Sequence, residues 1–290
     1  MSQTFQEIIN TALKTPEDAD YGIKEEAHTL PIGEMGLPWA MQLVEEQRKR
    51  WVPIERIGTA DQHIIMGFGG LATFDLVAVS DPPPAGVLLC DDNSSQAIFW
   101  ETFLQSIKES ESPQILRARF AALANERTDI QFFTPNHVIE EMAALQKYPS
   151  SESKFEWMYN EEKYGKIRKM VLDGKIAHIT LDALDSDRYK ILKKTLDDNG
   201  LFVSTLYLSN IHRFLVDEDA ETRGDFHKRK LTKSKEKTSR EFWGNQLLLC
   251  DDNTLILNAE PNEHYDQDII ESYTPQECRQ KFLRASASIC

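Results

Sequence analysis

The chain has 290 residues, of which 41% are hydrophobic and 28% are charged. This composition is typical of a globular protein and excludes a disordered or collagen-like chain. There are 47 acidic residues against 33 Lys and Arg, and the formal net charge of −14 makes the surface as a whole repel nucleic acid.

The four cysteines lack CxxC spacing, so they predict neither a disulfide scaffold nor a zinc site. The first residues lack the basic and apolar regions of a secretory signal. No apolar run reaches the ~18–20 residues of a membrane helix. We therefore expect a cytoplasmic protein without a membrane span, and signal-independent secretion stays open.

The chain divides by pattern into a helical N-terminal cap, a main domain and a C-terminal tail. Apolar residues recur at helical spacing from Phe5 to Leu13, and Pro38 opens a second helix. Thr274 begins a capping box that opens a short helix in the tail. We expect the three parts to span residues 1–60, 61–260 and 261–290.

Short apolar runs alternate with amphipathic helices in the main domain. The helices include Leu71–Val79, Ser186–Asp198 and one that starts near Ser94 and is expected to bury Ile98. Four runs predict buried strands: His63–Met66, Gly86–Cys90, Lys175–Asp182 and Leu201–Leu208. Asp129–Phe133 is a further strand candidate, which makes Lys175–Asp182 the third or the fourth strand.

This alternation predicts an α/β fold with a Rossmann-like, mostly parallel sheet and helices on both faces. Two apolar runs flank Asp251-Asp252-Asn253, so we expect a late antiparallel hairpin over Gln246–Leu257. Leu-Leu-Cys-Asp-Asp-Asn occurs at 88–93 and again at 248–253. The first copy is predicted to lead into a helix and the second into a strand, so we do not interpret them as a structural repeat.

Ligands of open α/β sheets bind outside the carboxyl ends of the strands, and four predicted strand ends carry polar or glycine-rich residues. Each has two interpretations that the sequence leaves open. Gly67-Phe68-Gly69-Gly70 is a cofactor loop or a structural turn. Asp91-Asp92 binds a ribose or caps a helix, and Asp182 binds a ligand or is a solvated strand end. Tyr207-Leu208-Ser209-Asn210 faces a substrate or forms a turn.

The segments Gly-Phe-Gly-Gly, Leu-Leu-Cys-Asp-Asp-Asn, His-Ile-Thr-Leu-Asp and Leu-Tyr-Leu-Ser-Asn follow one another in this order. The chain thereby resembles the class I S-adenosylmethionine-dependent methyltransferase superfamily. More narrowly, it is similar to a poorly characterised group of bacterial methyltransferase-like proteins. The chain departs from that group in lacking a basic residue beside Asp91, and Met66 stands where many methyltransferases place an acid.

The resemblance implies a seven-stranded sheet and S-adenosylmethionine as cofactor. It implies that Gly67, Gly69 and Gly70 approach the methionine portion, that Asp91 or Asp92 binds the ribose, and that Asp182 lies near the adenine. It also implies that Tyr207, Ser209 and Asn210 face the methyl group and an acceptor, which is a small molecule or a protein. The alternative is a catalytically silent binding protein on the same fold, such as a bacterial secreted effector.

Two further features have open interpretations. Residues 223–240 are rich in Lys and Arg and form a site for an acidic partner or a solvated loop. His212 follows the last strand end and is a candidate general base or a surface histidine in a short helix.

Overall fold

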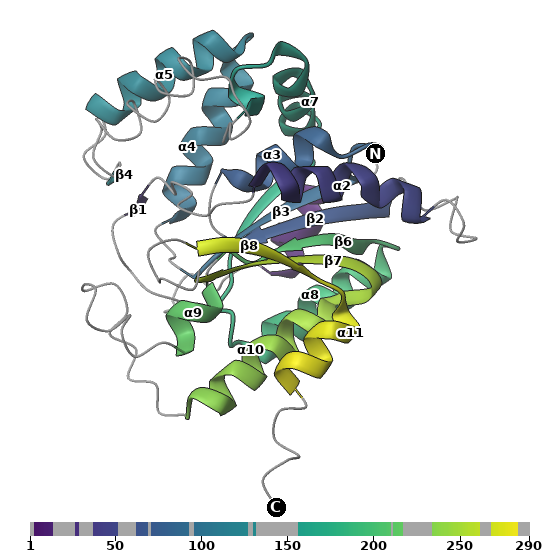
Figure 1. Cartoon of the computed structure of the whole chain (residues 1–290). Helices are drawn as coiled ribbons and strands as arrows, with labels where there is room; N and C mark the ends of the chain where they lie inside the picture. The colour runs from purple at the N-terminus through teal and green to yellow at the C-terminus, as the bar shows by residue number, and fades with distance from the viewer. Residues whose placement is uncertain are drawn as a thin grey trace, which may run out of the picture.

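The computed structural model describes residues 3–13, 27–28, 37–51, 62–68, 71–92, 96–126, 130–131, 156–209, 211–216, 234–261 and 268–283. Its centre is a six-stranded sheet in the order β5-β3-β2-β6-β7-β8 (Figure 1). These strands are β2 (His63–Phe68), β3 (Gly86–Asp91), β5 (Ile176–Thr180), β6 (Phe202–Tyr207), β7 (Cys250–Pro261) and β8 (Asp268–Tyr273). Neighbouring strands are parallel except β7 and β8, which are antiparallel. The predicted α/β fold with a mostly parallel sheet and a late antiparallel pair is therefore confirmed.

The strand order reverses once. From β2 the chain adds β3 and then β5 on one side, and it then returns to add β6, β7 and β8 on the other side. The strand candidate at 129–133 does not join this sheet, because β4 (Ile130–Gln131) pairs with β1 (Ala27–His28) in a separate two-stranded sheet. As a result β5 is the third strand of the main sheet. The described main sheet has one strand fewer than the seven that the resemblance implied.

The sheet is covered on both faces by helices (Figure 1). One layer consists of α2 (Leu37–Trp51), α3 (Ala72–Val79), α4 (Gln96–Glu109), α5 (Pro113–Glu126), η2 (Glu156–Met158) and α7 (Glu161–Leu172). The other consists of α1 (Phe5–Ala12), α8 (Ser186–Asp198), α9 (Ile211–Val216), α10 (Lys235–Leu249), α11 (Pro275–Cys278) and η4 (Arg279–Leu283). Successive strand residues enter alternate layers: Ile64 and Met66 pack with α1 and α8, and Ile65 packs with α3. Because both faces are buried, the strands are continuous apolar runs in the sequence.

The first helix shares the core of the main sheet. Thr4 and Glu7 form a capping box at its start. Phe5 then packs against β3 so closely that a Cβ at Gly86 would lie 2.5 Å from the Phe5 ring. On the opposite face α2 packs against α3. The helices of the expected cap thus lie on both faces of the sheet, and the division at residue 60 stays a prediction.

Two predicted features differ from the structure. The hairpin over Gln246–Leu257 is wrong, because Gln246 lies in the last turn of α10 and β7 runs unbroken from Cys250 through Asn253. Buried side chains such as Phe242 and Trp243 hold this segment helical against its neighbours. The expected burial of Ile98 is also wrong. It is 39% exposed because Phe99, Trp100 and Phe103 take the core-facing positions of α4.

Candidate functional site

The carboxyl ends of the parallel strands meet at one edge of the sheet. Gly67 on β2 is paired with Leu89 on β3 and with Tyr207 on β6. Backbone hydrogen bonds continue past the strands: Leu181 N–H donates to the Asp91 carbonyl at 2.7 Å, and Ala259 N–H donates to the Ser209 carbonyl at 2.8 Å. This carboxyl edge therefore brings together four of the predicted strand ends, and the reversal of strand order falls between β2 and β6.

Gly67 is needed for the close packing of α3. A Cβ at this position would lie 2.0 Å from Thr73 Oγ1, so any side chain would collide with the start of the helix. Thr73 Oγ1 is itself buried and has no hydrogen-bond partner within the described ranges. Among the described residues, the N-cap Leu71 provides no side-chain hydrogen bond to the first turn of α3, whose first N–H groups are the unpaired ones of any helix start. Gly69 and Gly70 lie outside the described residues.

The three predicted acids lie at the ends of β3 and β5, and all are half-buried. Asp182 shapes the turn that follows β5, because its Oδ1 accepts a hydrogen bond from Leu184 N–H at 2.9 Å. Three residues later Asp185 caps α8 by accepting from two backbone N–H groups. The edge thus carries partly accessible carboxylates, and that of Asp182 is fixed to a structured turn.

The end of β6 has an unusual backbone conformation. Tyr207 and Leu208 enter opposite core layers, and Tyr207 is only 1% exposed. Ser209 is half-buried and adopts a left-handed backbone with φ of 49°, which an L-residue rarely takes. Such strained positions cluster at functional sites. Asn210 lies outside the described residues.

Comparison with known proteins assigns the chain to a family. The family model "Domain of unknown function (DUF7790)" matches residues 55–229. The chain belongs to this family. Among solved structures, the rRNA methyltransferase aviRa from Streptomyces viridochromogenes is similar, with 10% identity and a TM-score of 0.36 over 90% of this chain and 87% of that chain. No curated protein matches.

The DUF7790 region contains a buried cation that sequence reasoning missed. Arg188 in the first turn of α8 is 7% exposed and donates a hydrogen bond to the Leu13 carbonyl at 3.2 Å. Burial and the Asp91 charge raise the pKa of the Cys90 thiol, and the Arg188 charge opposes them. The guanidinium therefore supplies positive charge beside the segment that lacks a basic residue of its own. Nothing in the pattern of α8 distinguishes this arginine from an exposed one, because its burial depends on α1.

His212 is not the surface histidine of the second interpretation. Its Nε2 lies 2.9 Å from Ser239 Oγ, and its ring contacts Phe242, Trp243 and Phe282. Burial, with a smaller effect of the Lys281 charge, lowers its pKa to about 4. The imidazole is therefore neutral at pH 7, and it packs between α9, α10 and η4.

The basic segment is described only from residue 234 onward. There it is the helical start of α10 and not a loop, with Lys235, Lys237 and Arg240 exposed. An acidic partner stays a prediction. No group of three or more His, Cys, Asp or Glu in the described part of the chain could hold a metal ion. None of the described helices is long and apolar enough to cross a membrane.

Proposed function

We propose that this DUF7790 protein binds S-adenosylmethionine at the carboxyl edge and transfers its methyl group to a small molecule or protein. The observation that carries the proposal is the reversal of strand order between β2 and β6, at the edge where Gly67, Asp91, Asp182 and Ser209 meet. In open α/β sheets this is where ligands bind.

The groups at the edge fit such a ligand. Carboxylates such as Asp91 and Asp92 accept hydrogen bonds from the two hydroxyls of a ribose. The start of α3 favours a negatively charged group such as the methionine carboxylate, and the Thr73 hydroxyl, which has no hydrogen-bond partner among the described residues, is a further donor there. In this arrangement we place Asp182 near the adenine, and we assign Gly69 and Gly70, which lie outside the described residues, to the methionine portion.

The bound cofactor supplies an already activated methyl group. The protein has to hold the acceptor in line with it, at a separation of the reacting atoms of ~3–3.5 Å. We assign this alignment to the end of β6, where Ser209 has a left-handed backbone, and to Asn210, which follows it in the sequence. The Asn210 amide can accept a hydrogen bond from an amine or amide acceptor. Tyr207 supports the turn from the core beneath it.

Isothermal titration with S-adenosylmethionine and S-adenosylhomocysteine tests binding, and Asp91→Asn with Asp92→Asn tests the ribose contact. Hydrogen bonds to charged groups contribute ~1.5–3 kcal/mol, so we expect affinity to fall by about 10- to 100-fold. The second copy of the hexapeptide supplies a matched control, Asp251→Asn with Asp252→Asn on β7, which should leave affinity unchanged.

No heat and no shift in melting temperature at millimolar ligand would contradict the proposal. Binding without transfer to any offered acceptor would instead identify the catalytically silent protein on the same fold. A secretion reporter fused to residues 261–290 tests the effector alternative separately.

A further inference from the structure

Helix α10 carries two consecutive buried amides, Asn245 and Gln246, which are 5% and 0% exposed. Buried amides destabilise a fold unless they are hydrogen-bonded. Asn245 Nδ2 donates to the Ala183 carbonyl at 3.1 Å, and Gln246 Nε2 donates to the Tyr189 hydroxyl oxygen at 2.6 Å. Both bonds join α10 to the same short stretch of chain.

That stretch consists of the turn between β5 and α8, which carries Asp182, and the first part of α8. Ala183 directly follows Asp182, and Tyr189 lies in the first part of α8. Within the turn, Asp185 N–H donates to the Asp182 carbonyl at 2.9 Å, in addition to the bond that Asp182 Oδ1 accepts. Asn245 therefore bonds within the internally bonded part of the turn, and Gln246 bonds to the helix that follows it.

The same turn is joined to the end of β3. The bond from Leu181 N–H to the Asp91 carbonyl fixes the distance between the two strand ends. A shift of the turn would therefore move Asp182 and strain its bond to the end of β3, which carries Asp91. A bond to a main-chain carbonyl is directional, and an apolar side chain at position 245 could not supply it.

We infer that Asn245 and Gln246 are positioning residues, which fix the Asp182 turn so that its carboxylate and that of Asp91 face the nucleoside portion of the ligand. The inference rests on the proposed function. It uses the general requirement that the supporting contacts of a binding site hold its groups to within about 0.5 Å. A role in stability alone is the competing explanation.

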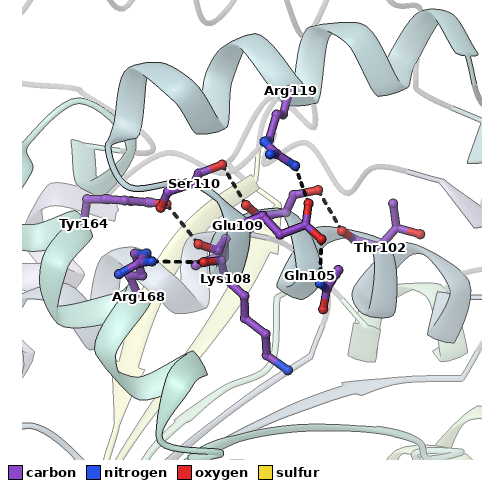
Figure 2. A network of polar contacts seen from close by, with 10 residues as sticks. Thr102, Gln105, Lys108, Glu109, Ser110, Arg119, Tyr164 and Arg168 are labelled. Atoms are coloured by element: carbon purple, nitrogen blue, oxygen red, sulfur yellow. Dashed lines mark hydrogen bonds and ion pairs between the residues drawn. The ribbon is translucent and has the colours of Figure 1, made fainter.

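A matched control is found at the opposite helical layer. The Tyr164 hydroxyl on α7 is buried and donates to the Ser110 carbonyl at 2.8 Å, beside the Arg168 bond to the Lys108 carbonyl (Figure 2). Tyr164→Phe removes a buried hydrogen bond to a main-chain carbonyl, as Asn245→Ala does. It does so at the junction of α4 and α7, without touching the Asp182 turn.

The test compares Asn245→Ala and Gln246→Met with Tyr164→Phe and the wild type. Hydrogen exchange in the absence of ligand is measured for the amides of Leu181–Tyr189, and S-adenosylmethionine affinity is measured by titration. We expect exchange in this segment to be about tenfold faster in the α10 variants, because the turn opens more easily without the bond to α10. A factor of ten corresponds to a decrease of ~1.4 kcal/mol in the free energy of local opening. We expect their affinity to fall about tenfold. Tyr164→Phe should change neither quantity. Gln246→Met keeps the volume of the side chain, so it gives the answer if Asn245→Ala does not fold.

Unchanged exchange in both α10 variants overturns the inference. So does equally fast exchange of Leu181–Tyr189 in Tyr164→Phe, since that outcome shows a general loss of stability. Faster exchange with unchanged affinity also overturns it. A wild type that binds no S-adenosyl compound overturns the proposed function, and the exchange data then decide separately whether the two amides fix the turn.

Discussion

Gly67 lies so close to Thr73 that even the methyl group of an alanine at position 67 is expected to destabilise the fold. Gly67→Ala places a methyl group 2.0 Å from Thr73 Oγ1, on a strand held between β3 and β6, so the Thr73 side chain, α3 or the strand must move. Overpacking of this kind destabilises by ~1–3 kcal/mol. We expect Gly67→Ala to lower the free energy of unfolding by about 2 kcal/mol in urea denaturation.

A second substitution and a control make this prediction specific. Thr73→Ala removes the two closest atoms and leaves only Cβ, at 3.0 Å, so the double variant should recover ~1 kcal/mol. Gly165→Ala should instead stabilise by ~0.5–1 kcal/mol, because its Cβ meets no described atom within 4 Å in α7. Additive losses at positions 67 and 73 would show that the contact is absent.

The cysteines are expected to be inert in the folded protein. Burial raises the pKa of Cys90 and of Cys250, and it raises that of Cys278 to about 12. Since the thiolate is the reactive form, almost none is present at pH 8. In a Cys290→Ser background, a dithiobis-nitrobenzoate reagent should label these thiols only after unfolding. Rapid labelling of the native protein would place at least one of them at the surface.

The contact of α9 with α10 and η4 predicts a pH dependence of stability. The pKa of His212 is about 4 in the folded protein against an ordinary 6.5, so the unfolded chain binds a proton in this interval that the folded chain does not. The stability from this group is complete above about pH 6.5 and is lost as the pH falls toward 4. Between pH 7 and pH 5 it should lose ~2 kcal/mol.

His212→Phe isolates this contribution. The aromatic ring keeps the packing against Phe242, Trp243 and Phe282 but cannot be protonated. Urea denaturation at pH 7 and pH 5 should therefore show a smaller loss in the variant than in the wild type, by about the same 2 kcal/mol. Equal losses in the two proteins would mean that the imidazole is accessible to protons in the folded state.

The repeated hexapeptide shows why some elements were predictable and others were not. At 88–93 it ends strand β3, as its apolar run predicts. At 248–253 the same letters span the end of α10 and the start of β7, because Phe242, Trp243 and Gln246 pack the preceding residues as a helix. The lysines and arginines before Phe242 make the first half of this helix polar, so the sequence there lacks an apolar helical repeat. Local pattern decides the strands of a buried sheet, and tertiary packing decides α10.

For the molecule as a whole, the meeting of the strand ends followed from the sequence. Alternating strands and helices predict a parallel sheet, and a parallel sheet puts all carboxyl ends on one edge. The contacts that each side chain makes could not be predicted from the sequence. Three contacts join segments whose packing no local sequence pattern encodes. They are the close approach of Thr73 to Gly67, the hydrogen bond from Arg188 to the Leu13 carbonyl, and the hydrogen bond from Asn245 to the Ala183 carbonyl.

The net charge of −14 predicts how salt affects the whole molecule. Self-repulsion destabilises the compact state, and it grows with the square of the net charge. Exposed ion pairs such as Lys193–Asp197 on α8 act in the opposite direction, but each is worth only ~0–1 kcal/mol.

Raising NaCl from ~10 to ~150 mM shortens the screening length from ~30 to ~8 Å. We therefore expect the melting temperature at pH 7 to rise by about 2 °C, since ~1 kcal/mol shifts it by that much in a chain of this size. At pH 5 partial protonation of carboxylates lowers the net charge, and the rise should shrink. A melting temperature that falls with salt at pH 7 would show that local ion pairs outweigh the repulsion.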